Sequence, residues 1–272
     1  ETISPMPLSF YIHIPYCVKR CGYCDFNTYT PGELKEGSDI AQVSNGYIDL
    51  LIQEAKIAWA EVKTNEPIPT IFLGGGTPTL MEPADLGRVL NSLEADFGFA
   101  RDIEITIEAN PDTVSKNKLA ALRSVGINRI SFGMQSAAPH VLAVLDRTHN
   151  PDNVVKATNW AREVGFEQVS VDLIYGTPGE SLADWQTSID AVLALPITHI
   201  SAYALIVEEG TKLAAQIKRG EVAQVDDDLT AEKYLVADKA FTAAGFEWYE
   251  LSNWAKSGSL SKHNLAYWLG DN

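Results

Sequence analysis

The sequence is poor in cysteine and in methionine, with three of each among 272 residues. It also lacks an apolar run of the length that a membrane-spanning helix requires, so no transmembrane segment is expected. Basic residues are scarce: 21 Lys and Arg stand against 36 Asp and Glu, which gives a formal net charge of −15. A surface that binds a phosphate backbone needs clustered Lys and Arg, so nucleic acid is not an expected partner.

The first residues, 1–5, lack the basic and apolar stretches of a secretory signal, so the sequence predicts a cytoplasmic location. Because the sequence does not begin with Met, we expect it to start inside a longer protein. One local charge run, Asp226–Asp228, has two interpretations. It is either a metal site or, as we favour, the solvated start of a helix before Leu229.

The three cysteines, Cys17, Cys21 and Cys24, all fall inside eight residues. A disulfide framework explains them poorly, because their number is odd and a chain of this length can bury its core without cross-links. Thiolate ligands for a soft metal, or a redox pair with a third thiol, are the remaining explanations. The spacing C-x3-C-x2-C supplies three ligands, so an iron–sulfur cubane held by it would keep one iron without a ligand from this loop.

Two other interpretations of the cysteine loop stay open. A structural zinc site could combine the three thiolates with His13, since mixed Cys and His ligation is common for zinc. His13, however, lies in a strand-like run, and the cysteine spacing differs from that of common zinc knuckles. A catalytic pair of Cys21 and Cys24 would leave Cys17 without a role, and the chain does not follow a thioredoxin-type pattern.

Short apolar runs alternate with longer amphipathic stretches six times, which is the pattern of βα units around a parallel sheet. The runs rich in Ile, Val, Phe or Tyr predict strands at Ser9–Ile14, Thr70–Leu73, Glu104–Glu108, Arg129–Gly133, Gln168–Asp172 and His199–Ala204. The stretches between them predict helices at Ser44–Val62, Pro83–Phe97, Ser115–Val125, Pro151–Val164 and Ser181–Leu195. After the last strand we expect a helix around Thr230–Ala244, a strand within Phe246–Tyr249 and an irregular tail.

Helix ends carry local signals as well. Gly126 and Gly165 stand where helices should end, and Ser181 with Asp184 resembles a capping box.

Six βα units fit either a partial barrel or a doubly wound sheet. In both, chemistry gathers at the carboxyl ends of the strands, and here those ends carry the cysteine loop, a glycine turn and several carboxylate or amide side chains.

The cysteine loop after a first strand, with the aromatic Tyr23 before the last Cys, resembles the radical S-adenosylmethionine superfamily. That resemblance implies an α/β fold, a partial (β/α)6 barrel with a short mixed C-terminal extension. It also implies that the glycine turn Gly74–Pro78 receives the methionine end of S-adenosylmethionine. A triple glycine alone is weak evidence, since any tight βα turn can use one. We expect the barrel over residues 1–206 and the extension over 207–272.

A narrower resemblance covers almost the whole chain. Five further segments resemble the oxygen-independent coproporphyrinogen III oxidases and their sister group, the HemW-type haem chaperones: Tyr11–Pro15, Gly74–Pro78, Glu108–Pro111, Ser131–Gln135 and Asp172–Pro178. Members of both groups continue into a further C-terminal domain, whereas this sequence ends four residues after Trp268. The resemblance therefore implies that the sequence is truncated.

The resemblance assigns roles to individual residues. Cys17, Cys21 and Cys24 would hold a [4Fe-4S] cluster. The positions that match cofactor contacts of the group, here for S-adenosylmethionine, are Tyr11, Tyr23, Gly75, Gly76, Thr77, Glu108, Gln135, Arg147 and Asp172. Without the family, Gln135 and Arg147 read equally well as surface polar residues, whereas Glu108 and Asp172 at strand ends are harder to explain that way.

Two features separate the sister groups. The oxidases carry a fourth cysteine two positions after the third, where this chain has Phe26. The segment His263–Trp268 matches the H-N-x-x-Y-W motif of the haem chaperones, and His263 is a candidate haem ligand, since imidazole is a common axial ligand. A histidine near a chain end is otherwise a solvated or packing residue.

The resemblance thus implies a haem chaperone that binds a cluster, S-adenosylmethionine and haem and delivers haem to client haemoproteins, with an electron donor as a further partner. The alternative is a radical enzyme that acts on coproporphyrinogen III, which Phe26 argues against. Whether the chain is an enzyme stays open. One aromatic group has two interpretations, a pocket for a macrocycle or part of the core: Trp248, Tyr249, Trp254, Tyr267 and Trp268.

Overall fold

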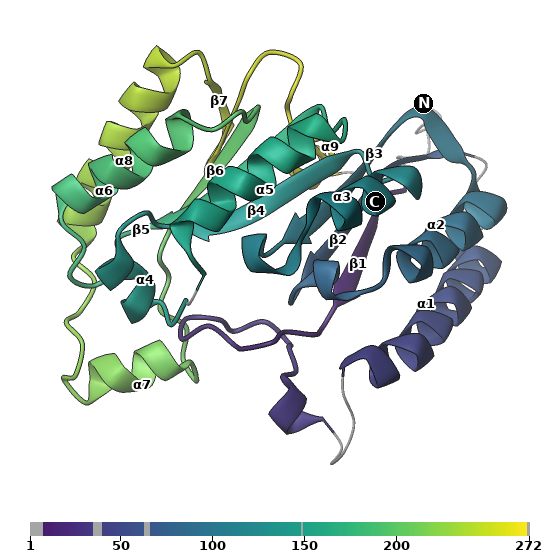
Figure 1. The fold of residues 1–272 in the computed structure, drawn as a ribbon, viewed down its shortest axis with the longest axis horizontal. Coiled ribbons are helices and arrows are strands. Elements are labelled where there is room, and N and C mark those ends of the chain that lie inside the picture. Colours follow the sequence, from purple (N-terminus) through teal and green to yellow (C-terminus); the bar gives the residue numbers. More distant parts are fainter. Residues whose placement is uncertain (1–7, 35–39, 63–65, 148, 271–272) are drawn as a thin grey trace.

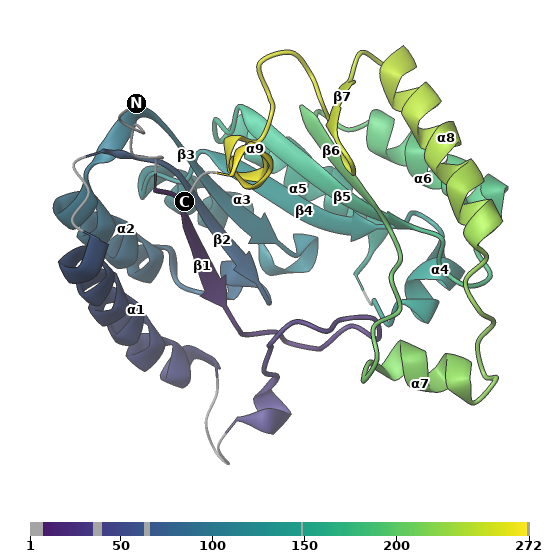
Figure 2. The same cartoon turned by 180° about the vertical axis from the view of Figure 1, so that it is seen from behind.

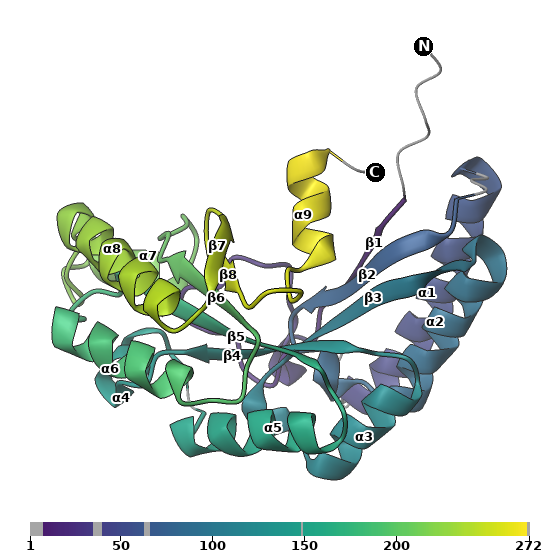
Figure 3. The ribbon, with the colours of Figure 1, turned by 90° about the horizontal axis from the view of Figure 1, so that it is seen from above.

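The computed structural model describes residues 8–34, 40–62, 66–147 and 149–270. Residues 1–5, which bear on the signal-peptide prediction, lie outside this part of the chain. The described residues form one curved sheet, with helices packed along its convex side (Figures 1 and 3). Among the described helices, none is both long and apolar enough to cross a membrane.

The sheet has eight strands in the order β1-β2-β3-β4-β5-β6-β8-β7. Six consecutive strands pair in parallel: β1 (Phe10–Ile14), β2 (Ile68–Gly75), β3 (Phe99–Ala109), β4 (Arg129–Gln135), β5 (Gln168–Tyr175) and β6 (His199–Ala204). Two short strands continue the sheet antiparallel to their neighbours: β8 (Asn253–Ala255) and β7 (Glu247–Glu250). The sheet does not close on itself, so the predicted partial barrel is confirmed (Figure 3).

The helices of the βα units lie close to the predicted ranges. They are α1 (Ile40–Val62), α2 (Pro83–Phe97), α3 (Lys116–Ser124), α5 (Pro151–Glu163), α6 (Leu182–Leu193) and α8 (Asp227–Ala243). Three short helices were not predicted: α4 (Pro139–Val144), α7 (Lys212–Lys218) and α9 (Lys262–Leu269). The expectation of an irregular tail was therefore wrong, because β8 and α9 both lie in it. Segments this short show too little periodicity to reveal their structure.

Several local predictions hold. Gly126 and Gly165 adopt positive φ values of 103° and 93° at the ends of their helices. Asp226 is the N-cap of α8, where its side chain accepts a hydrogen bond from the Leu229 backbone N–H, so the acidic run begins a helix. Ser181 and its partner three residues later form a capping box on α6.

Strand alternation separates the core from the barrel interior. Successive side chains of a strand point to opposite faces, and the apolar ones pack under the helices on the convex side. The opposite set, which faces the concave interior, is largely polar in β4, β5 and β6. In β5, for example, Val169 and Val171 are fully buried in the core, whereas Ser170 and Asp172 line the interior. The interior of the barrel therefore carries polar side chains from these strands, beside apolar ones such as Phe72 and Ile174.

The later segment of the chain is joined to the barrel through the sheet. β8 pairs with β6, and α9 packs against the concave side near β2 (Figure 3). The division of the chain at residue 206 stays a prediction.

Candidate functional site

The cysteine loop leaves β1 and runs across the open end of the barrel to α7 (Figure 2). Backbone hydrogen bonds fix it at both ends. The Cys17 N–H donates to Tyr29 O at 3.0 Å, and the Gly22 N–H donates to Leu145 O at 3.1 Å. The first turn of α7 completes the anchoring, because the Leu213 N–H donates to Gly22 O at 2.8 Å. The loop is thus held by segments that lie far apart in the sequence.

A cavity of about 370 Å³ lies where this loop meets the carboxyl ends of the strands. All three cysteines line it. Eight of the nine residues predicted to contact S-adenosylmethionine also line this cavity: Tyr23, Gly75, Gly76, Thr77, Glu108, Gln135, Arg147 and Asp172. Tyr11, the ninth, stacks on Phe72 beside the glycine turn, with its ring centroid 6.1 Å away. The fold therefore brings together residues that span more than 150 positions of sequence.

The glycine turn is shaped by packing against β1. A Cβ atom at Gly76 would lie 2.6 Å from Tyr16 O, and one at Gly75 would lie 2.5 Å from the His13 ring. Gly75 also has φ +108°, which other residues rarely adopt. These glycines let the backbone pass close to β1 and leave the Gly75 N–H at the cavity wall.

That N–H donates to Glu108 Oε2 at 3.0 Å. Burial raises the pKa of Glu108 to about 8, and the neighbouring Asp172 carboxylate adds to the effect. Burial also raises the pKa of Asp172, although Ser131 donates to its Oδ1 at 2.8 Å. The wall of the cavity thus holds two carboxyl groups whose environment favours the neutral form.

Two more polar side chains line the cavity, and an irregularity in β4 positions the first of them. The register shifts between Gly133 and Gln135, and Gln135 takes a φ of +64°, an uncommon value for a residue other than glycine. Arg147 reaches the same place, where its Nη2 donates to Gly133 O at 2.8 Å. The Gln135 Oε1 and the Arg147 Nε are buried and have no hydrogen-bond partner among the described residues. Buried polar atoms without a partner are uncommon, and a ligand bound in the adjoining cavity would be one explanation for them.

The thiols lie among donors that suit thiolate ligands. Arg147 Nη1 donates to Cys21 Sγ at 3.4 Å, and Thr77 Oγ1 donates to Cys17 Sγ at 3.8 Å. Burial raises the pKa values of Cys17 and Cys24, so the free thiols are protonated and binding of a metal would release protons. Hydrogen bonds to sulfur of this kind tune iron–sulfur clusters.

The zinc alternative finds less support in the geometry. Both ring nitrogens of His13 are engaged, since Nε2 donates to Asn27 O at 2.8 Å and Nδ1 lies 3.1 Å from Tyr11 Oη. Over the described ranges, no three or more His, Cys, Asp or Glu side chains converge as a single metal ion would require. A cluster of several irons binds each thiolate at a different iron, so its ligands need not converge on one point.

A second cavity, of about 430 Å³, fills the concave interior of the barrel. It joins the first, because Cys24, Phe26, Glu108, Gln135 and Asp172 are among the residues that line both. Its walls come from the inward side chains of the central strands, which include Arg129, Ser131, Ser170, His199, Ser201 and Tyr203. Of these residues, only Ser131 lies in a segment that carries the sequence resemblance. For the others, polar side chains at every second position of a buried strand are a usable signal.

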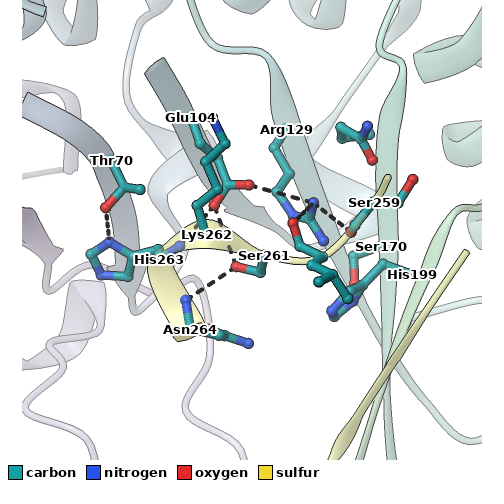
Figure 4. Close-up of polar contacts among 12 residues, drawn as sticks. Thr70, Glu104, Arg129, Ser170, His199, Ser259, Ser261, Lys262, His263 and Asn264 are labelled. Atoms are coloured by element: carbon teal, nitrogen blue, oxygen red, sulfur yellow. Dashed lines mark hydrogen bonds and ion pairs between the residues drawn. The ribbon is translucent and has the colours of Figure 1, made fainter. Parts of the chain in front are cut away.

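His263, the candidate haem ligand, lies beside Thr70 of β2 and Glu104 of β3, away from the carboxyl ends of these strands (Figure 4). Its side chain is buried between Phe72 and Tyr267, and its Nδ1 lies 2.8 Å from Thr70 Oγ1. Its Nε2 is buried and has no hydrogen-bond partner among the described residues, and burial lowers its pKa to about 4. A neutral imidazole is the form that binds iron, but Nε2 is not accessible in this arrangement.

Charged groups hold the segment around His263 in place (Figure 4). The His263 N–H donates to Glu104 Oε1 at 3.0 Å, and Arg129 Nη1 donates to Ser259 O at 3.0 Å. Glu104 Oε2 and Arg129 Nη1 lie 3.6 Å apart, and both side chains are buried. The segment from Ser259 into α9 therefore closes the amino end of the barrel.

The five aromatic residues of the C-terminal segment do not line one pocket. Trp254 is fully buried in the core, and Tyr249 bonds to His199 Nε2 at 2.8 Å through its hydroxyl group. Trp248, Tyr267 and Trp268 are more than half exposed. None of the five lines either cavity described above.

Comparison with known sequences decides the family. The profile of the Radical SAM superfamily matches residues 11–192, which span the cysteine loop and most of the barrel. The chain belongs to the radical SAM superfamily. Among its relatives, "Heme chaperone HemW" of Mycobacterium tuberculosis is 44% identical over 98% of this chain and 68% of its own length. The protein of that name from Bacillus subtilis is 38% identical over 97% of this chain and 67% of its own length.

The fold of this radical SAM protein agrees with a solved structure. Coproporphyrinogen III oxidase (HemN) from Escherichia coli, a radical SAM enzyme, superposes with a TM-score of 0.81 at 26% identity. The match covers 98% of this chain and 59% of the oxidase chain. The predicted resemblance to these two groups is confirmed, and the chain spans about two thirds or less of the proteins that it matches.

Proposed function

We propose that this radical SAM protein is a haem chaperone, which binds haem and delivers it to client haemoproteins. The observation that carries the proposal is the 44% identity, over 98% of the chain, to a protein named as a haem chaperone. Phe26 supports it, because this residue stands where the oxidases would place a fourth cysteine. Haem and client haemoproteins are then the partners, with an electron donor for the cluster, and a cytoplasmic location belongs to the same proposal.

The residues at the open end of the barrel fit the cofactors that the superfamily implies. Three thiols and a guanidinium group, that of Arg147, share one cavity with free polar atoms of Gln135. We propose that Cys17, Cys21 and Cys24 hold a [4Fe-4S] cluster. When bound, the cluster and S-adenosylmethionine supply one-electron chemistry that protein side chains lack.

The protein's own residues would bind and orient S-adenosylmethionine. The Gly75–Thr77 turn and Glu108 form one wall of the cavity, and Gln135 and Arg147 form another. Glu108 with a pKa of about 8 can donate a hydrogen bond as a neutral acid or accept one as a carboxylate. Asp172 lines both this cavity and the barrel interior, and Tyr23 and Tyr11 complete the proposed contacts.

A second candidate function is oxidation of coproporphyrinogen III by a radical SAM enzyme. It is favoured by the superposition on the oxidase and by the interior cavity, which shares lining residues with the cofactor cavity. Such a chamber can hold a substrate next to the reacting group. Phe26 counts against this candidate, for the reason given above.

The two functions separate in a paired measurement on anaerobically reconstituted protein. Haem binding is titrated by its absorbance, and transfer to an apo-haemoprotein is followed beside coproporphyrinogen turnover. We expect haem binding and transfer without turnover. Turnover in the absence of haem affinity would replace the chaperone with the enzyme, and a colourless protein with stoichiometric zinc would exclude both.

A further inference from the structure

Four large apolar side chains surround the mouth of the two joined cavities. Val18 and Phe26 belong to the cysteine loop, and Tyr203 and Ile206 belong to the end of β6 and the segment after it. Their exposed fractions are 64%, 59%, 44% and 70%. We call these four residues the apolar rim. Exposed apolar side chains gathered at one place commonly mark a binding surface, because leaving them in water is unfavourable.

The two segments that carry the rim lie close together beside the joined cavities. The cysteine loop and the segment after β6 run close together, as the hydrogen bond from the Leu213 N–H to Gly22 O requires (Figures 1 and 2). Phe26 lines both cavities, while Val18 lines the first and Ile206 the second. Phe26 thus stands where the two cavities meet.

Behind the rim, polar side chains join the apolar ones. The interior is lined by hydroxyl, imidazole and carboxyl groups, such as Ser170, Asp172 and His199, and also by the apolar side chains of Phe72 and Ile174. At its far end, the segment from Ser259 into α9 closes the barrel. A ligand that enters past the rim therefore meets apolar surface at the entrance and both apolar and polar groups beyond it.

From this arrangement, and resting on the proposed function, we infer that the apolar rim is the binding site for the macrocycle of a tetrapyrrole. A planar amphipathic ring has an apolar face and edge that match the rim and polar substituents that match the interior. The rim side chains are between 44% and 70% exposed, so a ring bound against them stays partly outside the cavity. A partly exposed ligand suits a protein that hands it on.

This site differs from the one that the C-terminal motif indicates. His263 is 4% exposed and its Nε2 is enclosed, so binding to iron there would require α9 to move. The rim needs no such movement. It also recognises the ring rather than the metal, so it should bind a porphyrin that contains no iron.

The test uses metal-free mesoporphyrin IX, with haem in parallel, on reconstituted protein in the presence of S-adenosylmethionine. The double variant F26S/I206S removes one side chain from each side of the rim. Burying such a side chain against a ligand is worth about tenfold in affinity, so we expect the double variant to bind the porphyrin roughly 100-fold more weakly.

Two controls accompany it. The variant I57S/L235S removes apolar side chains of α1 and α8 that are 65% and 66% exposed, far from the rim in sequence. We expect it to bind as the unchanged protein does. His263→Ala should likewise leave the affinity for the metal-free porphyrin unchanged. If F26S/I206S loses iron or unfolds, the single variant I206S, which lies outside the cysteine loop, decides the question with an expected loss of about tenfold.

The outcomes separate the rim from the proposed function. Equal porphyrin binding by the rim variants and the unchanged protein would overturn the rim site while leaving the chaperone function intact. So would an equal loss in I57S/L235S, which would mean that the porphyrin adheres to any exposed apolar side chain. If the unchanged protein binds no haem at all, the proposed function itself fails.

Discussion

The two ends of the barrel are built in opposite ways. At the carboxyl ends of the strands, buried polar atoms of Gln135 and Arg147 lack partners among the described residues, and three thiols line a cavity. At the amino ends, Glu104 and Arg129 are bonded to each other and to the segment that carries His263. Unpaired atoms alone do not separate the two ends, since Arg129 Nη2 and His263 Nε2 at the amino ends also lack partners among the described residues. The difference lies in their surroundings: the carboxyl ends surround a cavity lined by three thiols, whereas the charged groups at the amino ends attach the segment around α9 to the sheet.

The contrast also bears on the C-terminal motif, whose role as a haem-binding site stays a prediction. Its histidine carries the residue type that haem iron prefers, but it lies at the closed end, with Thr70 on Nδ1 and aromatic rings on both faces. Its neighbours in the motif, Tyr267 and Trp268, lie exposed on the outer side of α9. In this arrangement the motif acts as the closure of the barrel.

The largest effect is expected at the open end, from loss of a thiol. Cys21→Ala should lower the iron retained after anaerobic reconstitution by at least about tenfold, because one of three proposed ligands and the acceptor of the Arg147 hydrogen bond are lost. The retained iron is measured by metal analysis and by visible absorbance. The cofactor-free protein should lose no more than about 1 kcal/mol of unfolding free energy, because the side chain is only half-buried.

Phe26→Ala, in the same loop, serves as the control and should keep its iron. Iron retention by Cys21→Ala at the level of the unchanged protein would contradict the proposed ligand set and the contrast between the two ends.

At the closed end, Glu104→Ala should cost about 3–5 kcal/mol of unfolding free energy, because it leaves the buried Arg129 charge unpaired. It also removes the acceptor for the His263 N–H at the start of α9. Urea denaturation of the cofactor-free protein measures the loss.

The matched control is Asp102→Ala, which removes the ion-pair partner of Lys262, the first residue of α9. That pair is exposed to solvent, so we expect a loss below about 1 kcal/mol. Similar losses for both variants would show that the closed end depends on surface charge rather than on its buried pair.

The unfolding free energy should depend on pH through a carboxyl group at the open end of the barrel. The pKa of Glu108 is raised from its ordinary value to about 8, so the folded protein keeps a proton that the unfolded chain has already released. Its contribution is therefore most favourable at low pH and is lost as the pH rises through about 8. Between about pH 6 and pH 9 the cofactor-free protein should lose about 2 kcal/mol, reduced from the full shift because the side chain meets solvent in the cavity.

Glu108→Gln should remove most of that loss, whereas Glu247→Gln on the exposed edge of β7 should leave it in place. Denaturation curves at the two pH values provide the measurement. An unchanged pH dependence in Glu108→Gln would mean that this carboxyl group is solvated and ionised at neutral pH.

Much of the fold follows from patterns that the sequence displays directly. The ranges of β6 and α2 agree with the prediction, since a β-rich run and a Pro-initiated amphipathic stretch mark them. The convergence of the cysteine loop, the glycine turn and Glu108 could also be predicted, because parallel strands bring their carboxyl ends to one edge. The site at that edge follows from topology together with local motifs.

The closed end could not be predicted in the same way. Glu104 and Arg129 are 25 residues apart, and both bond to a segment more than 120 residues further on. No local pattern links such positions, because their partnership arises only from tertiary packing. The short helix α9 has local signals only at its ends, the Ser261 N-cap and the left-handed Gly270, and the burial of His263 depends on that helix docking against β2.

The smallest expected effect tests whether the closed end stays closed when haem binds. Thr70→Val removes the hydroxyl group that bonds to His263 Nδ1, which leaves both ring nitrogens of a buried imidazole without a partner. We expect a loss of about 1–2 kcal/mol of unfolding free energy, against a few tenths for Thr187→Val on the exposed face of α6.

Haem affinity decides what this loss means. If the closed end serves only stability, Thr70→Val and the unchanged protein bind haem equally once both are fully folded. If α9 must open to bring His263 to the iron, weakening its attachment favours the open form and raises the apparent haem affinity, up to the roughly tenfold that about 1.4 kcal/mol allows. Tighter haem binding by Thr70→Val would therefore place the haem-binding site at the amino end of the barrel, which is closed in this structure.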